Sequence, residues 1–233
     1  MSEAAQHIFK GIYTWRFKRC NTPDREGIVE VIERSVRAGT AIPAVSYWGC
    51  GDRSFVNRYD VQALDFLGEF RANATRLWAP GIAVTFVMTD IHGVVNGKDP
   101  GGMERYFEGI RELMAERGYD SLLLSRLWEE GGYSVADLDG RWPALEGEWE
   151  RLSIRHLLVA RARRHARGVD PVLAARRYLA ACSIDAEVVG RRFPGSILIS
   201  YNGPDYAPIL PPLPKMYLCS LKRRSSVKPW HCS

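Results

Sequence analysis

The chain has 233 residues, of which 46% are hydrophobic and 25% charged, and it carries a net charge of +5. This composition is typical of a soluble globular domain that is long enough to bury a sizeable core. No stretch approaches the roughly 18 uninterrupted apolar residues of a membrane span, and the N-terminus lacks the apolar run of a secretion signal. We therefore expect a cytoplasmic protein without a membrane partner, whose charge favours anionic partners such as sugar phosphates or nucleic acid.

Helix and strand patterns alternate through the first half of the chain. Thr22 and Pro23 predict the N-cap and first turn of a helix that ends near Gly39. A strand is predicted over 41–46, then a glycine-rich polar loop over 48–54, and Asp60 is expected to cap the next helix. Four further elements continue the rhythm: a strand over 82–90, a loop over 96–102, a helix from about 104 to 117 and a short apolar segment at 122–124.

The second half of the chain is more helical. Residues 145–165 predict one helix, and Asp170 with Pro171 caps another that should carry Leu173, Tyr178, Leu179 and Cys182 inward. Arginines crowd the outer faces, and we interpret them first as a solvated helix surface, with a phosphate-binding patch as the alternative: Arg155, Arg161, Arg163, Arg164, Arg167, Arg176 and Arg177. A strand over 196–201, an ordered proline-rich connection over 208–214 and a final strand over 216–221 follow.

These patterns predict an α/β fold, a Rossmann-like and mainly parallel sheet flanked by helices. We expect a single domain over residues 1–233, with a helical, arginine-rich middle segment at about 143–190. The five cysteines are odd in number and show no CxxC spacing, so the sequence indicates neither a disulfide framework nor a zinc site: Cys20, Cys50, Cys182, Cys219 and Cys232.

The strand predicted over 82–90 is the most informative part of the chain, because it runs directly into Asp90 and His92. Ligands bind at the carboxyl ends of strands in open α/β sheets. Asp90 and His92 are therefore the first candidates for a catalytic site, although a capping aspartate and a hydrogen-bonded structural histidine are the alternatives. Cys50, in the glycine-rich loop, is interpreted as a packed thiol rather than a nucleophile.

Several standard chemistries lack their motifs. The chain contains no GxGxxG after the first strand, no GxxxxGK[ST], no HExxH and no GxSxG. The five histidines are too scattered to suggest a metal by spacing, so the sequence predicts no metal and no cofactor. Only His92 and His231 fall at predicted strand ends or site loops.

The order of three sets of motifs resembles the isocyanide synthase family of pyoverdine- and dityrosine-type biosynthesis. The first set runs from Ile42-Pro-Ala through Ala63-Leu-Asp-Phe-Leu67 to the strand that ends in Asp90. The second comprises residues 186–194, with their Phe-Pro turn, and the strand at 197–202. The third is the terminal Lys228-Pro-Trp-His231, which is similar to a closing Thr-Pro-Trp-His.

This resemblance implies a short, divergent member that joins an amino acid of the tyrosine or tryptophan type to a ketose phosphate such as ribulose 5-phosphate. Such chemistry needs a phosphate clamp, a carboxylate binder and a proton shuttle. The resemblance implies that Asp90, His92 and His231 are the catalytic residues, with Asp90 orienting a histidine or the amine. The expected substrate-binding residues are Asp52, Arg53, Ser54, Tyr201, Asn202, Lys222 and Arg223, with arginine and lysine as the anion binders.

The chain departs from the family pattern at two places. The family's Pro-x-Lys-Ser is matched by Gly49 to Ser54, which holds no lysine, and its Ser-Ile-His has become Ser200-Tyr201-Asn202. One alternative is an enzyme that uses charged tRNA, like the cyclodipeptide synthases, with Ser46 or Ser54 accepting an aminoacyl group and the arginine face holding tRNA. A second alternative is a non-catalytic relative that keeps the fold. The oligomeric state is left open.

Overall fold

A computed structural model describes residues 2–51, 53–166 and 168–219. Its centre is a five-stranded sheet in which every neighbouring pair is parallel, in the order β3-β2-β1-β4-β5. The strands are β1 (Ile42–Trp48), β2 (Ile82–Met88), β3 (Asp120–Leu123), β4 (Ile197–Ser200) and β5 (Lys215–Tyr217). The predicted fold class, a Rossmann-like parallel sheet flanked by helices, is thereby confirmed.

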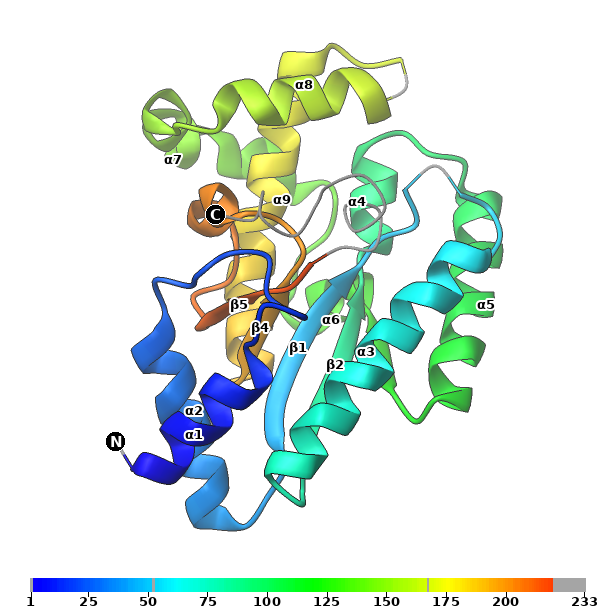
Figure 1. The fold of residues 1–233 in the computed structure, drawn as a ribbon. Helices are drawn as coiled ribbons and strands as arrows, with labels where there is room; N and C mark the ends of the chain where they lie inside the picture. Colours follow the sequence, from blue (N-terminus) through cyan, green and yellow to red (C-terminus); the bar gives the residue numbers. More distant parts are fainter. Residues whose placement is uncertain (1, 52, 167, 220–233) are drawn as a thin grey trace.

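Helices cover both faces of the sheet (Figure 1). One face packs against α1 (Glu3–Ile12), α2 (Arg25–Ala38), α3 (Arg58–Leu77) and α5 (Pro100–Glu116). The other packs against α4 (Asp90–Val95), α6 (Leu124–Glu130), α7 (Asp137–Arg151) and α9 (Pro171–Arg192). Apolar residues such as Val45 and Phe86 are fully buried in the central strands, as expected of strands that are covered on both sides.

A third apolar cluster lies beyond the end of the sheet, where α8 (Arg155–His165) crosses α9 (Figure 1). The prediction of one helix over 145–165 is wrong, because the chain leaves the helix at Leu152, whose backbone is extended, and re-enters it at Arg155. Ile154 in this break is buried in the third cluster, and its burial fixes the turn that lays α8 across α9.

Several predicted helix ends and orientations differ in the structure. Asp24, not Thr22, precedes α2, because the Thr22 hydroxyl instead donates to the carbonyl of Lys215 at 2.6 Å and ties this segment to β5. Asn57 is the N-cap of α3. Asp60, the third residue of the helix, completes the capping box by accepting from the backbone N–H of Asn57. Leu173 was expected to face inward but is 43% exposed, since it lies beside Arg176 and Arg177 on the outer side of α9.

The remaining differences concern the lengths of elements. Strand β2 ends at Met88, so Asp90 opens a helix instead of closing a strand. Helix α5 begins at Pro100, inside the predicted loop, because Asp99 caps it by accepting from Gly102 N at 2.7 Å. The sequence also left α1, α4, α6 and the 3₁₀ helix η1 (Pro204–Ile209) unpredicted. Among the described residues, no helix combines the length and apolar character needed to cross a bilayer.

Candidate functional site

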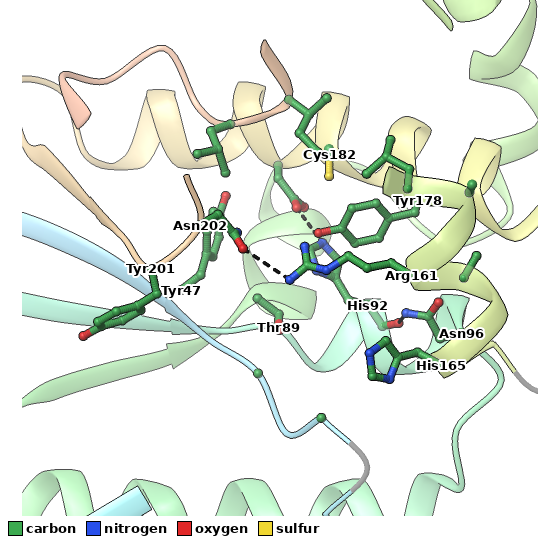
Figure 2. A pocket seen from close by; sticks show the side chains of 18 of the residues that line it. Tyr47, Thr89, His92, Asn96, Arg161, His165, Tyr178, Cys182, Tyr201 and Asn202 are labelled. Atoms are coloured by element: carbon green, nitrogen blue, oxygen red, sulfur yellow. Dashed lines mark hydrogen bonds and ion pairs between the residues drawn. The ribbon is translucent and has the colours of Figure 1, made fainter. Parts of the chain in front are cut away.

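The strand order places a cavity at the point where the sheet changes direction. From β1 the chain builds β2 and β3 on one side, and later β4 and β5 on the other, so the ends of β1 and β4 flank a crevice. Such a switch point is where open α/β sheets bind ligands. A cavity of about 320 Å³ lies there, lined by the ends of these strands, by α4 and by α8 and α9, which cross above it (Figure 2).

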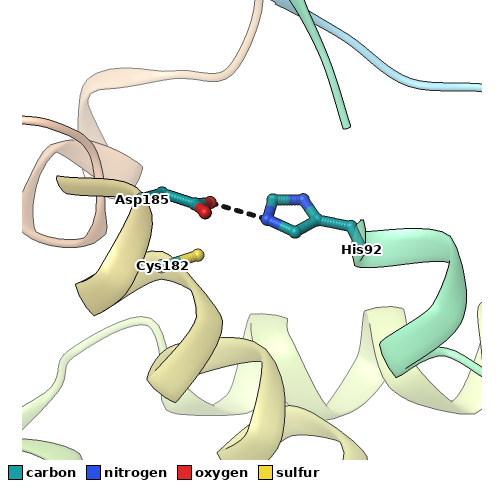
Figure 3. Close-up of side chains that lie close together, drawn as sticks. All are labelled: His92, Cys182 and Asp185. Atoms are coloured by element: carbon teal, nitrogen blue, oxygen red, sulfur yellow. Dashed lines mark hydrogen bonds and ion pairs between the residues drawn. The ribbon is translucent and has the colours of Figure 1, made fainter. Parts of the chain in front are cut away.

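The cavity contains a closely hydrogen-bonded pair of polar side chains. His92, in α4 directly after β2, places Nε2 2.6 Å from Oδ2 of Asp185 in α9 (Figure 3). The other carboxylate oxygen of Asp185 accepts from the indole N–H of Trp128 at 2.9 Å, and Asp185 is only 2% exposed. Because a carboxylate can only accept, Nε2 carries the hydrogen of this bond, and in the neutral form of the imidazole Nδ1 has a lone pair. No described residue bonds to Nδ1, which leaves it available to a ligand.

Helix α9 supplies one wall of the cavity through residues spaced at helical intervals. Tyr178, Cys182 and Asp185 follow one another at four and three positions and so share one face of the helix. Burial, together with the nearby Asp185 carboxylate, raises the pKa of the Cys182 thiol well above its usual range. The pKa of Tyr178 is also raised, chiefly by the adjacent Cys182 and by burial. Both groups are therefore neutral at physiological pH, and Asp185 is the acidic group of this wall.

Tyr47 closes the cavity from the sheet side. It is the penultimate residue of β1, and its side chain points toward α9 (Figure 2). Burial raises the pKa of its hydroxyl, and the Asp185 carboxylate raises it further. The hydroxyl is buried and has no hydrogen-bond partner among the described residues. An unpaired buried hydroxyl is costly, so a group that enters the cavity would gain by bonding to it.

A cation, Arg161 of α8, faces the cavity from the side opposite the sheet. The guanidinium of Arg161, in α8, lies 5.0 Å from the centre of the Tyr206 ring and donates to Oδ1 of Asn202 at 3.2 Å (Figure 2). This is its one hydrogen bond to the described residues, although a guanidinium has five N–H donors. Arg161 is thus held in place by a ring and an amide while donors are left for an anion.

The structure brings three of the sequence-predicted residues to this cavity, namely His92, Tyr201 and Asn202. Asn202 orients Arg161, as described above. Tyr201 lines the cavity, but its ring points away from His92 and packs with the cluster on the opposite face of the sheet (Figure 2). Burial raises the pKa of its hydroxyl, which keeps it protonated. Their roles in catalysis and binding stay predictions.

Asp90 does not line the cavity. Its Oδ1 accepts from the backbone N–H of Ser125 at 3.0 Å, at the beginning of α6. This corresponds to the structural alternative of a capping aspartate. The carboxylate that holds His92 is that of Asp185, which was not among the predicted site residues.

Arg53 and Ser54 also lie outside the cavity lining. Arg53 donates to Asp60 Oδ1 at 2.5 Å and to the carbonyls of Cys50 and Gly49. Arg53 therefore holds the loop after β1 against α3, and Ser54 packs beside the first turn of α5. Cys50 is 3% exposed, which fits the interpretation of a packed thiol.

Four predicted residues, Asp52, Lys222, Arg223 and His231, lie outside the described residues, as does Arg167. The other predicted arginines do not form one face. Arg161 faces the cavity, Arg176 lies over the Trp142 ring, and Arg177 pairs with Asp139 at 3.1 Å. Arg163 and Arg164 remain exposed. Ser46, a proposed aminoacyl acceptor, is fully buried and donates to the carbonyl of Ile199.

Sequence reasoning missed Asp185 as a site residue and included Arg161 only in the alternative of a phosphate-binding patch. A signal for Asp185 exists, because it is an acid within the apolar run Ala180 to Val189, in phase with Cys182 and Tyr178. A buried acid on the apolar face of a helix needs a partner, and that partner has to come from elsewhere in the chain. Arg161 carries no such signal, since it is one of several arginines in its helix.

Neither a family model nor a curated protein matches the chain. Among solved structures, its fold is similar to the crystal structure of the PvcA protein from Pseudomonas aeruginosa, with a TM-score of 0.65. The match covers 98% of this chain and 87% of that chain at 16% sequence identity. At this identity the likeness establishes a shared fold across nearly the whole chain.

Proposed function

We propose that this chain is a biosynthetic enzyme of the isocyanide synthase type, which acts on an amino acid in the cavity between the ends of β1 and β4. The observation that carries the proposal is the convergence, in one cavity at the switch point, of the His92–Asp185 pair and the Arg161 guanidinium. The fold shared with PvcA across nearly the whole chain is consistent with an α/β enzyme of this kind. The ordered motifs of the sequence point in that direction independently.

The chemistry of the cavity suits an amino acid of the tyrosine or tryptophan type and a ketose phosphate such as ribulose 5-phosphate. Its volume of about 320 Å³ lies at the lower end of the range for small-ligand sites. Arg161 would bind a carboxylate or phosphate, since a guanidinium fork matches either anion. The Tyr47 hydroxyl would bond to a polar group of the substrate that lies against the sheet.

His92 would transfer a proton in this reaction. Condensing an amine with a ketone and then releasing the sugar-phosphate remainder requires a group that accepts a proton and returns it. The lone pair on Nδ1 of His92 is the acceptor, and Asp185 stabilises the imidazolium that forms while fixing the ring orientation. Asp185 acts through His92 and is therefore a positioning residue.

The test is to incubate the purified protein with tyrosine or tryptophan and ribulose 5-phosphate and to seek an isonitrile by mass spectrometry. Arg161→Gln should weaken substrate binding by about 10- to 100-fold, the cost of one charged hydrogen bond. The matched control is Arg163→Gln, which removes the same charge from an exposed position of the same helix and should leave binding unchanged. Equal losses in both variants would show that Arg161 acts only through general charge.

The charged-tRNA alternative gains no support from the cavity, because Ser46 is buried against β4 and Ser54 lies outside the lining. A parallel binding assay with bulk tRNA separates the two. Absence of an isonitrile together with tight, salt-sensitive tRNA binding would replace the proposed function with that alternative.

A further inference from the structure

Three side chains with different ligand atoms converge on one wall of the cavity. A ring nitrogen of His92, Sγ of Cys182 and a carboxylate oxygen of Asp185 all lie within 4.8 Å of one another (Figure 3). Cys182 and Asp185 come from consecutive turns of α9, and His92 comes from α4. We propose that these three residues bind a divalent metal ion of the zinc type, with a fourth coordination position open to the cavity.

The set of donor atoms favours zinc over the hard cations. Mg²⁺ and Ca²⁺ take oxygen ligands, whereas Zn²⁺ accepts imidazole nitrogen, thiolate sulfur and carboxylate oxygen together. Three protein ligands and one open position are the pattern of catalytic zinc sites, while structural sites use four. The charges also balance, because a thiolate and a carboxylate supply two negative charges and the neutral imidazole supplies none.

The ligand atoms lie near the spacing that a tetrahedral ion requires. Tetrahedral zinc with bonds of 2.0–2.3 Å separates its ligand atoms by roughly 3.3–3.6 Å. His92 and Asp185 stand closer than this, at 2.6 Å, because a hydrogen bond joins them. Small side-chain rotations that open this pair and draw Cys182 inward would accommodate the ion. The ion would take the place of the hydrogen on Nε2 and of the thiol hydrogen of Cys182.

Two neighbouring groups suit a metal site. The indole N–H of Trp128 holds the second oxygen of Asp185 at 2.9 Å, which is the kind of outer contact that orients a ligand carboxylate. The Tyr47 hydroxyl has no partner among the described residues, and Tyr47 lines the same cavity as His92, Cys182 and Asp185. It would therefore lie near the open position, where a water or substrate atom bound to the ion could bond to it.

The metal site goes beyond the proposed function and does not depend on it, since binding is measured without substrate. In a single molecule, the hydrogen bond between His92 and Asp185 and the binding of a metal ion by both side chains exclude one another. Nε2 of His92 cannot donate a hydrogen bond to Asp185 and bind an ion at the same time. Metal-loaded and metal-free protein would therefore differ at His92.

The probe is Co²⁺, which reports a bound thiolate by a sulfur-to-metal charge-transfer band, with Zn²⁺ as the competitor that removes the band. Wild-type protein should bind a single Co²⁺ with this band. Cys182→Ser should lose the band while remaining folded by circular dichroism. Asp185→Asn should keep the band but bind at least about tenfold more weakly, because it loses a ligand.

The matched control is Cys50→Ser. Cys50 is also buried, but the Nζ of Lys98 lies 3.8 Å from its sulfur, so it presents no site for a cation. This variant should keep both the band and the affinity. A wild-type protein without the band, a band that persists in Cys182→Ser, or one that disappears in Cys50→Ser would each overturn the proposal.

Discussion

His92 and Asp185 lie 93 positions apart in the chain, yet Nε2 of one donates to Oδ2 of the other at 2.6 Å. The contact joins the helix after β2 to the middle of α9, and it places an imidazole with a fixed orientation at the switch point of the sheet. Of the two aspartates that could orient His92, the fold uses the distant one. Asp90, two residues away, caps α6 instead.

Asp185→Asn should reduce kcat of the proposed reaction by about 10²- to 10⁴-fold, because His92 loses the carboxylate that stabilises its protonated form. Asparagine has the same shape and can still accept from Trp128, so the melting temperature should change little. Product formation by mass spectrometry and thermal unfolding check the two halves of this prediction. Glu187→Gln, a surface change on the same helix, should leave kcat intact. A large fall in melting temperature with Asp185→Asn would instead make the carboxylate structural.

Asp60→Asn should destabilise the fold by about 3 kcal/mol. Asp60 is 1% exposed and accepts from Arg53, Tyr106 and the backbone of Asn57. The substitution removes the negative charge that pairs with Arg53 and replaces one of the two acceptor oxygens by an NH₂ donor. Asp65→Asn is the control, since the Asp65–Arg117 pair is at the surface and should contribute less than about 1 kcal/mol. Urea unfolding of both variants measures the difference. Equal effects would contradict the importance of burial here.

Gly93→Ala should cost about 1–3 kcal/mol, because a Cβ at this position would lie 1.9 Å from Sδ of Met103, a buried side chain that must shift to make room. Gly140→Ala in α7 should instead increase the stability of the fold. Nothing lies within 4 Å of its added Cβ, so alanine should stabilise that helix by about 0.5–1 kcal/mol. Thermal unfolding compares the two variants. A stabilised Gly93→Ala would show that this contact relaxes freely.

Stability should fall steeply above pH 10. Burial raises the pKa values of Tyr13 and Tyr106, and that of Tyr217 to about 12. A phenol whose folded pKa exceeds its unfolded value of 10.0 contributes stability that is complete below pH 10 and is lost as the pH rises toward the folded pKa. Each such tyrosine should cost about 1.4 kcal/mol per pH unit in that interval. Lys215, whose pKa is lowered by desolvation, opposes this trend in part.

Tyr217→Phe tests the origin of the alkaline transition. The Tyr217 hydroxyl is buried and has no hydrogen-bond partner among the described residues, so phenylalanine removes the titrating group without removing a bond. The variant should equal or exceed the wild-type melting temperature at pH 7 and lose stability less steeply between pH 10 and 12. Melting temperatures measured across this range check the slope. An unchanged slope would exclude Tyr217 as a contributor.

Local patterns in the sequence were enough to predict most of the sheet. Apolar runs such as Ile82 to Met88 predict buried strands, and the alternation of these runs with helical periodicity predicts a parallel sheet covered on both faces. The break between α7 and α8 was missed, because it depends on the burial of Ile154 against α9 and not on a glycine or proline. The start of α3 was misplaced because Asn57 and Asp60 form one capping box, in which Asn57 is the N-cap and Asp60 lies at the third helical position.

The sequence by itself therefore determined the fold class and placed His92 just beyond the carboxyl end of a strand, since both follow from periodicity and from the rule that parallel strands end at one edge. Only the tertiary structure decided which groups meet His92. Asp185, Cys182 and Arg161 come from helices that the chain forms long after β2, and the packing of α8 and α9 over the cavity brings them there. Local patterns fix the face of a helix on which a side chain lies, but its partner depends on how that helix packs against the rest of the fold.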